Sequence, residues 1–354
     1  MVARRAILST AAGLALALGG CTNIGAARLG IDRSDYANHL RETNKEQLLL
    51  NIVAMRYGDS PLFLEVSSVI SQYTREGSLH ADAEIKPPAG DAKGGVGGSI
   101  LLRETPTITY TPLAGERFAR NLLSPISPAS LLGMLESGWS VDPLFRLAVR
   151  SINGVSNGGR EPLFAHRADT DFVEVIGAMD RLQRDGGLAI HIERDKDKDG
   201  KFMASGQIAE ALTERDRADL ALLRKRFKLP GTGGQLQISF GNAQTAPNQL
   251  AIGTRSMFEI ITEMAQGVDV PADEKGRAMP PEPGTEADVP LIHIRSGTSQ
   301  PADAHVAVHY RGRWFWIDGG DVESKRMFLI VQILQSLNDT SGGANAPLVT
   351  IPTG

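Results

Sequence analysis

The amino-acid sequence predicts an α+β protein in which helices and antiparallel hairpins surround one large core. Some segments carry apolar residues at the helical period and others alternate apolar with polar residues. These segments follow one another without the regular strand–helix–strand rhythm of a parallel sheet. The chain has 354 residues, of which 42% are hydrophobic and 22% charged, so it can bury a sizeable core.

The first twenty residues have the plan of a secretory signal. They read MVARRAILSTAAGLALALGG, with a basic start, an apolar run and small residues at the end. The alternative is a transmembrane helix, but the apolar run is only about 15 residues long, against the ~20 that span a bilayer. We therefore expect a signal peptide over 1–20.

The only cysteine of the chain, Cys21, follows this signal directly. The tetrapeptide Leu18-Gly19-Gly20-Cys21 resembles the lipobox of bacterial lipoproteins. The resemblance implies that Cys21 receives a diacylglyceryl group, that the signal is cut before it, and that the new N-terminus is acylated. A buried core cysteine is the alternative. With one cysteine, the chain forms no internal disulfide and no cysteine zinc site.

Lipidation makes the membrane a predicted partner through the N-terminal lipid. In enterobacteria-like sorting, Thr22 after the lipid cysteine is permissive for the outer membrane, so we expect a lipid-anchored protein that faces the periplasm; the inner membrane is the alternative. The net charge is −4, and −6 once Arg4 and Arg5 are removed. No basic face or tail is present, so no nucleic-acid partner is expected.

The N-terminal third is predicted to alternate ordered and mobile segments. Residues 21–33 form a lipidated tether, and a helix over 36–57 ends at Gly58-Asp59-Ser60-Pro61. A strand over 62–71 follows. Residues 81–99, with Pro-Pro and paired glycines, are predicted to be a mobile loop, followed by a strand over 101–110.

Residues 34–354, which include the segments described after the tether, are predicted to form one periplasmic domain. Ser-Pro and Gly-Trp-Ser sequences separate three short helices, and Thr213-Glu214-Arg215-Asp216 has the first-turn acid expected at a helix start. The expected helices are 114–123, 128–137, 141–151, 169–184, 213–228, 256–266 and 322–337. The expected strands are 188–193, 202–209, 235–240, 249–253, 291–295, 305–310, 313–318 and 348–351. A second mobile loop is expected over 271–290.

The hairpin over 305–318 is the candidate ligand surface. With Arg311-Gly312 as a two-residue turn, Tyr310 faces Arg313, His309 faces Trp314, Ala307 faces Trp316 and His305 faces Asp318. One face then holds the core residues Val306, Val308, Phe315 and Ile317. The other holds His305, His309, Trp314, Trp316 and Asp318. Aromatic rings beside titratable groups favour a platform for sugar or peptide, and burial under a covering helix is the alternative.

No metal site or cofactor is expected. Asp195, Asp197 and Asp199 before Gly200 resemble the first half of a calcium loop, but the twelfth position is Gly206 instead of glutamate, which favours a solvated turn. His305 and His309 lie about 13 Å apart on a strand and do not share an ion. The sequence has no G-x-S-x-G, H-E-x-x-H or P-loop motif, so enzymatic activity is left open, with the balance against it.

Three segments resemble uncharacterised proteobacterial lipoproteins. They are 44–53 with Arg56-Tyr57-Gly58-Asp59-Ser60-Pro61, 106–112, and Tyr310 to Asp318. This resemblance carries no known activity. The sequence therefore predicts a binding or assembly module of the cell envelope with an envelope protein as partner. The alternative is an envelope hydrolase or saccharide-binding protein that uses the 305–318 hairpin.

Overall fold

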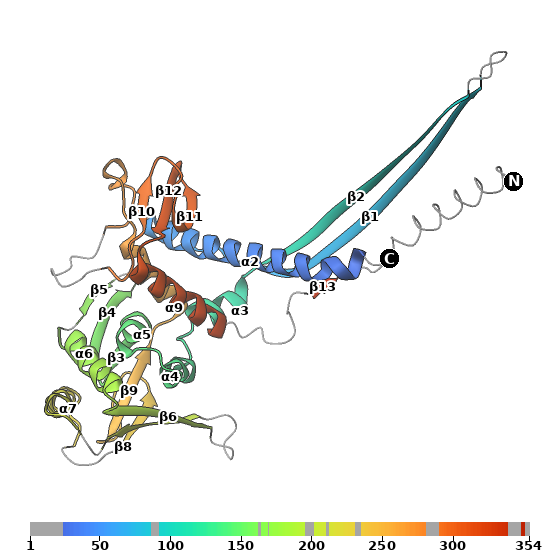
Figure 1. Cartoon of the computed structure of the whole chain (residues 1–354). Coiled ribbons are helices and arrows are strands. Elements are labelled where there is room, and N and C mark those ends of the chain that lie inside the picture. Colours follow the sequence, from blue (N-terminus) through green and yellow to red (C-terminus); the bar gives the residue numbers. More distant parts are fainter. Residues whose placement is uncertain are drawn as a thin grey trace. The chain divides into compact units, whose positions relative to one another are not determined.

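A computed structural model describes residues 24–85, 92–161, 164–168, 170–194, 202–209, 212–230, 235–280, 290–338 and 348–350. The chain divides into two compact units, where the sequence predicted one domain over 34–354. The first unit contains 64–112 and both ends of the chain, and the second contains 42–63 and 113–340. The α+β class is confirmed, since helices and mostly antiparallel strands are interspersed (Figure 1).

The first helix, α2, runs over Ile24–Arg56 and is 33 residues long. The predicted helix over 36–57 is confirmed, and it extends back to Ile24, into the segment 21–33 that was predicted to be a tether. The segment 24–33 contains no proline, and its two glycines only weaken a helix. The helix ends where predicted, because Gly58 has the left-handed φ of 80° that a side chain resists.

The first unit is dominated by a long two-stranded ribbon, which we call the ribbon: β1 (Leu64–Ile85) paired antiparallel with β2 (Ala92–Pro112). A short parallel strand, β13 (Leu348–Thr350), joins β1 at Ser68 to Ile70. The predicted mobile loop over 81–99 is wrong at 81–85 and 92–99, which are strand. Residues 86–91 lie outside the described part of the chain. The glycine content of the segment 81–99 suggested a loop. In the structure, each residue of 81–85 and 92–99 pairs with a residue of the opposite strand, and together they form a β-ladder.

The second unit is built on a seven-stranded sheet in the order β5-β4-β3-β9-β8-β7-β6. All neighbours are antiparallel except β8 and β9. Its strands are β3 (Val149–Ile152), β4 (Val155–Glu161), β5 (Phe164–Ala168), β6 (Leu188–Arg194), β7 (Phe202–Ile208), β8 (Gln235–Phe240) and β9 (Gln249–Thr254). The expected helix over 141–151 is confirmed for 141–148 and wrong for 149–151, because the chain continues after Ala148 as β3.

The helices of this unit largely match those predicted. They are α3 (Gly115–Phe118) with a π-helical turn over Ala119–Leu123, α4 (Pro128–Glu136), α5 (Val141–Ala148), α6 (Thr170–Arg184), α7 (Glu214–Arg226), α8 (Met257–Met264) and α9 (Val322–Asn338). Thr213 and Ser256 cap α7 and α8 with reciprocal hydrogen bonds to Asp216 and Glu259. These caps are the local reason for the two helix starts.

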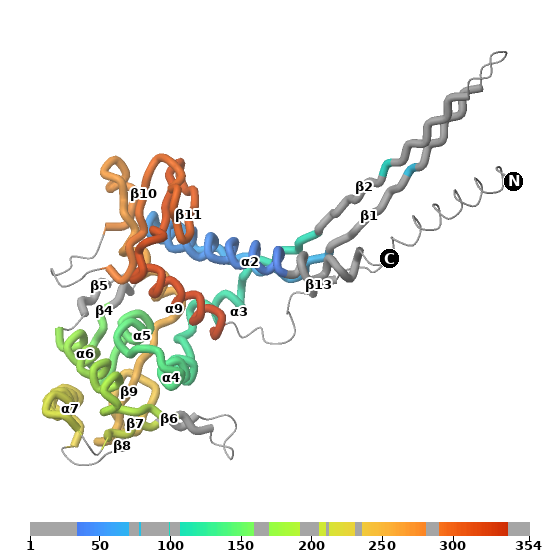
Figure 2. The backbone as a smooth tube through the Cα atoms, viewed as in Figure 1, coloured from blue at the N-terminus to red at the C-terminus, as the bar shows by residue number. Residues whose placement is uncertain are grey.

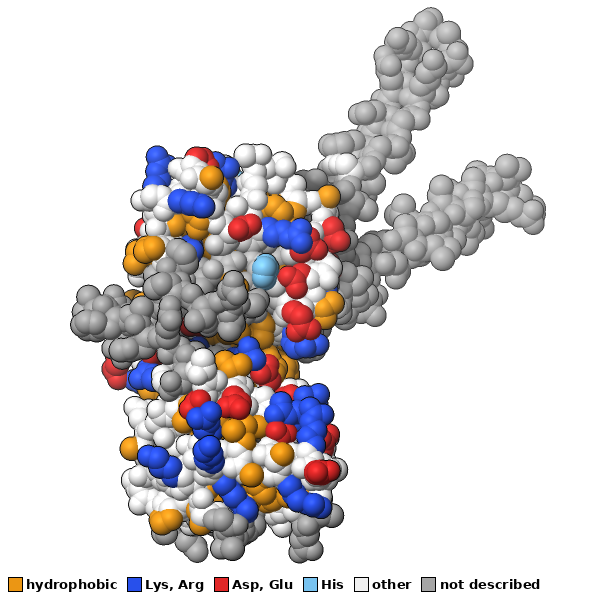
Figure 3. All heavy atoms as spheres, turned by 90° about the vertical axis from the view of Figure 1, so that its left-hand side faces the viewer, with side chains coloured by type: hydrophobic (Ala, Val, Ile, Leu, Met, Phe, Trp, Pro, Cys, Tyr) orange, Lys and Arg blue, Asp and Glu red, His pale blue; other side chains and the backbone are white. Residues whose placement is uncertain are grey.

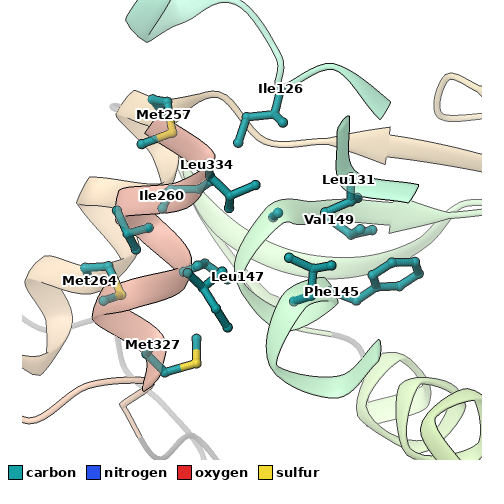
Figure 4. Close-up of a cluster of buried hydrophobic side chains, with 14 of the residues drawn as sticks. Ile126, Leu131, Phe145, Leu147, Val149, Met257, Ile260, Met264, Met327 and Leu334 are labelled. Carbon is teal, nitrogen blue, oxygen red and sulfur yellow. The ribbon is translucent and has the colours of Figure 1, made fainter. Parts of the chain in front are cut away.

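A second sheet of three strands has the order β10-β12-β11. The strands are β10 (Arg295–Gly297), β11 (Ala304–Tyr310) and β12 (Arg313–Asp318). Helix α9 lies between this sheet and helices α4 and α8 (Figure 2). Its buried Met327 and Leu334 meet Met257, Ile260 and Leu147 in one continuous apolar core (Figure 4).

The segment that follows α8 is ordered in part. A 3₁₀ turn over Ala272–Glu274 and hydrogen bonds from Arg277 and Ala278 back to Glu274 fix its first half. The mobile-loop prediction over 271–290 is therefore wrong for 271–280, while 281–289 lie outside the described residues. Polar composition suggested mobility, but Glu274 is buried and bound by its neighbours.

Within the described residues, no helix joins the length and the apolar character that a membrane span requires.

Candidate functional site

The hairpin formed by β11 and β12 turns at Arg311 and Gly312, which have φ values of 49° and 81°. Positive φ at both turn residues is the type I′ geometry that suits a two-residue hairpin. Three predicted pairs are confirmed: Tyr310 with Arg313, His309 with Trp314, and Ala307 with Trp316. The predicted inner residues Val306, Val308, Phe315 and Ile317 are all buried.

The fourth predicted pair is wrong. A bulge between Ala304 and Val306 shifts the register, so that Ala304, and not His305, faces Asp318. The His305 ring instead meets Phe328 of α9 edge-on, with 6.1 Å between ring centroids. His305 therefore leaves the predicted ligand surface. A one-residue bulge of this kind leaves no signal in simple alternation.

The other face of the sheet keeps its aromatic character, and we call it the outer surface: Arg295, Ala307, His309, Trp314, Trp316 and Asp318. His309 and Trp314 stack edge-to-face with centroids 5.4 Å apart. Trp316 lies over Gly297, where an added Cβ would come within 3.2 Å of the indole. Arg295 and Asp318 form an ion pair of 3.1 Å. Arg295 and Gly297 carry no sequence signal for this surface, because β10 is three residues long and has no alternation.

The two tryptophans of the outer surface stay half-buried, and His309 is exposed. The alternative was burial of these tryptophans under a covering helix. Neither tryptophan is fully buried. Flat rings with accessible faces and a nearby ion pair can contact the apolar face of a sugar ring or a peptide. This is the property that makes the outer surface a candidate binding site.

The inner side of the hairpin joins a polar group that the sequence analysis did not identify as a site. Tyr57, at the end of α2, is 6% exposed and packs edge-on against Phe315, with ring centroids 6.0 Å apart. Its hydroxyl donates a hydrogen bond of 2.5 Å to Oε2 of Glu274. Burial, followed by the Glu274 hydrogen bond and charge, raises the pKa of Tyr57 well above its ordinary value, so the phenol stays neutral.

Glu274 has a second partner in the same place. Nε of Arg313 lies 3.1 Å from Oε1 of Glu274, and its guanidinium also pairs with Asp273. These bonds, first among them that to Glu274, raise the pKa of Arg313. We call Tyr57, Glu274 and Arg313 the buried triad. Because one carboxylate serves a phenol and a guanidinium, the triad ties α2, the 273–274 turn and β12 together.

A more exposed group continues from the triad. The Tyr310 hydroxyl donates to Asp59, and Arg311 Nη2 lies 3.1 Å from the same carboxylate oxygen. The Tyr310 hydrogen bond, and then Arg311, keep the pKa of Asp59 below its usual range. The Arg311 guanidinium also lies over the Tyr57 ring at 5.3 Å, a cation–π distance.

The local sequence explains why these residues meet. The α2 helix stops at Gly58, and Asn51 of its last turns fixes the outgoing chain through two hydrogen bonds with Leu62. The backbone N–H of Met279 donates to the carbonyl of Arg56 at 2.8 Å, which holds the 271–280 segment beside the helix end. Two of the segments that carry the lipoprotein resemblance, 56–61 and 310–318, are thereby neighbours.

Each carboxylate of this group accepts from a phenol or a guanidinium. The acids are thus neutralised by their neighbours, as expected of a group that fixes structure. Among the residues that the structure describes, no three His, Cys, Asp or Glu side chains gather closely enough to hold a metal ion. On the face seen in Figure 3, acidic and basic side chains are interspersed.

Two sequence-predicted features fall outside the described residues. They are the lipobox, Leu18 to Cys21, and the Asp195–Gly200 turn. Comparison of the chain with family models, with curated proteins and with solved structures finds no match.

Proposed function

We propose that this chain is a lipid-anchored protein of the bacterial envelope that faces the periplasm from the outer membrane and acts there as a binding or assembly module. The observation that carries the proposal is Leu18-Gly19-Gly20-Cys21 at the end of a secretory signal. Two or more acyl chains on one residue anchor a protein stably, because each buried methylene contributes about 0.8 kcal/mol.

The polar chemistry of the second unit supports a binding module over an enzyme. In the buried triad, Glu274 is held between Tyr57 and Arg313, and the neutral phenol is already a donor to it. A general base needs a carboxylate that is available to a substrate proton. The contact-making residues of the outer surface, by comparison, are half-buried or exposed.

The test compares the native chain with Cys21→Ser and, as a matched control, Thr22→Ser. Cells are fed a fatty acid with a bio-orthogonal tag, and envelopes are then solubilised in mild detergent for co-purification. We expect label and outer-membrane fractionation for the native chain and Thr22→Ser, and no label on Cys21→Ser. A stoichiometric envelope protein is expected with the native chain. An unlabelled native chain, or one that always purifies alone, contradicts the proposal.

The outer surface favours a second function, saccharide or peptide binding. One side of the sheet holds the rings of Trp314, Trp316 and His309. Arg295 and Asp318 form an ion pair on the same side. Peptidoglycan fragments are the natural probe, because they combine sugar rings with a peptide. Tryptophan fluorescence reports the binding directly.

The variants Trp314→Ala, Trp316→Ala and Asp318→Ala are expected to abolish fragment binding while the thermal midpoint changes little. His305→Ala is the matched control, since its ring packs on α9 and is not part of the outer surface. Binding that survives both tryptophan substitutions, or a collapse of the folded state, excludes this second function.

A further inference from the structure

The far half of the ribbon has a regular two-sided pattern. Between Gly77 and Ile85 on β1, and between Ala92 and Ile100 on β2, every residue is paired with one on the other strand, without a bulge. Directly paired positions share a face of an antiparallel ribbon, and the face changes at each step along the chain. The register therefore assigns every position here to one of two faces.

One of these faces holds only apolar residues and glycine. Its positions are Gly77 with Ile100, Leu79 with Gly98, Ala81 with Val96, Ala83 with Gly94, and Ile85 with Ala92. The other face holds only polar residues and glycine. Its positions are Ser78 with Ser99, His80 with Gly97, Asp82 with Gly95, and Glu84 with Lys93. We call the first set the apolar face and the second the polar face.

Side chains at one pair of positions agree with this assignment. The hydroxyls of Ser78 and Ser99 are exposed and lie 2.7 Å apart across the ribbon. Threonine and serine pairs of this kind stabilise directly opposed positions.

The apolar face has the length of a membrane strand. Nine residues per strand at ~3.3 Å per residue extend about 30 Å, and a membrane-spanning strand has roughly 9–11 residues. Beyond Ile100 the same face continues with Arg75 opposite Leu102 and Tyr73 opposite Glu104. The apolar stretch thus ends at charged and aromatic positions, as such stretches do where hydrocarbon meets water.

The ribbon edges decide what must accompany it. In the described residues β13 occupies only 68–70 of β1, and β2 has no neighbour but β1. Backbone N–H and C=O groups along an edge cannot remain unpaired in hydrocarbon, where each costs several kcal/mol. A ribbon that enters lipid therefore needs strands on both sides, and an identical ribbon has the matching length and the matching pattern.

We propose that the far half of the ribbon enters a lipid bilayer with its apolar face against the acyl chains, paired edge to edge with the ribbons of further copies of this chain. This deepens the envelope function proposed above and rests on it for bringing the chain to a membrane. The lipid at Cys21 raises the local concentration of ribbons at the bilayer, and the ribbons supply the contact between copies.

Two adjacent glycines of β2 give a matched test. Gly98 is a position of the apolar face and Gly97 a position of the polar face. In the mature chain over 21–354 carrying Cys21→Ser, which has neither the lipid nor any cysteine, Gly98→Asp and Gly97→Asp are compared by flotation with vesicles of phosphatidylcholine and phosphatidylglycerol. We expect the parent and Gly97→Asp to float and to yield cross-linked multimers, and Gly98→Asp to lose flotation at least several-fold.

A second measurement does not depend on disruptive variants. Single cysteines at 79, 80, 81 and 82 in the same background carry an environment-sensitive fluorophore. With vesicles, emission is expected to rise several-fold at 79 and 81 and to stay low at 80 and 82, a period of two. Glu116→Cys, whose parent side chain is 85% exposed in the second unit, is the unresponsive control.

Each other result overturns the proposal. The proposal is wrong if the parent chain does not float, if both aspartate variants float equally, or if the protein floats strictly as a monomer. It is also wrong if the emission lacks the period of two. Capture of a different envelope protein by the ribbon, without vesicle binding, overturns it as well. These failures are distinct from failure of the proposed function, since Gly98→Asp in the native Cys21 chain still takes up the fatty-acid label if that function holds.

Discussion

Two hairpins of this chain share an alternation of apolar residues along their strands, but they differ in what packs against the apolar face. In β11–β12 the apolar positions Val306, Val308, Phe315 and Ile317 are buried against helices of their own unit. In the far half of the ribbon the apolar positions alternate as regularly, but the described strands beside them are only β1 and β2. A two-stranded hairpin is only marginally stable by itself in water, so the stability of each hairpin depends on what packs against its apolar face.

Alternation of apolar and polar residues therefore establishes an apolar face but not what that face packs against. In β11–β12 the partner comes from the same chain, and the opposite face is half-buried or exposed. For the ribbon, the apolar face is matched in length to a bilayer, and its edges to copies of itself. The predictions below test whether the two hairpins differ in this way.

The largest effect is expected for Phe315→Ala. Phe315 is fully buried, and removing its ring leaves a cavity that costs about 3–5 kcal/mol of unfolding free energy. Val96→Ala in the ribbon is expected to change the unfolding free energy of the vesicle-free Cys21→Ser chain hardly at all. Urea unfolding followed by tryptophan fluorescence measures both. A comparable loss in Val96→Ala would mean that the ribbon packs within the chain, and the contrast would disappear.

The second effect concerns the anchoring of β12 to its unit. Glu274→Ala removes the buried acceptor of both Tyr57 and Arg313, and we expect a loss of about 3 kcal/mol. Asp273→Ala is the control, since that carboxylate is 66% exposed and shares the same turn. Its ion pair with Arg313 is expected to contribute less than 1 kcal/mol, or about the value of a surface pair. Equal losses would show that the triad is not the anchor.

A smaller effect isolates one hydrogen bond of that anchor. Tyr57→Phe keeps the ring on Phe315 and leaves Glu274 paired with Arg313, so we expect a loss of about 1 kcal/mol. Differential scanning calorimetry of Tyr57→Phe, Glu274→Ala and the double variant measures their coupling. Strict additivity in the double variant would contradict a shared bond.

Sequence reasoning predicted the parts of the molecule that are fixed locally. The helix starts at Thr213 and Ser256, the helix end at Gly58 and the turn at Arg311-Gly312 all depend on a few adjacent residues, and each was predicted from the sequence. The alternation in 306–317 likewise gave the buried face of the hairpin.

What the sequence did not predict depends on distant residues. The buried triad joins Tyr57 to Glu274, 217 positions apart, and composition around Glu274 suggested only a loop. The ribbon was missed because glycine is a poor strand former on average, whereas pairing along the whole length of β1 stabilises Gly94 to Gly98 as strand. At the bulge between Ala304 and Val306, the His305 ring contacts Phe328 of α9, a contact that no local pattern predicts.

The smallest expected effect is a pH dependence at His305, on the inner side of β11. Burial lowers the pKa of His305, and the charges of Lys45 on α2 and Lys325 on α9 lower it further against Glu42. The unfolded chain, with an ordinary pKa of about 6.5, then takes up the proton first. The unfolding free energy therefore falls as pH drops from about 6.5 toward the lowered pKa, and the loss levels off below it.

Urea unfolding at about pH 7.5 and about pH 5.5 measures this slope. His305→Gln is expected to flatten it. An unchanged slope in His305→Gln would place that ring in water, on the outer surface, and the hairpin would then present both of its histidines to a ligand.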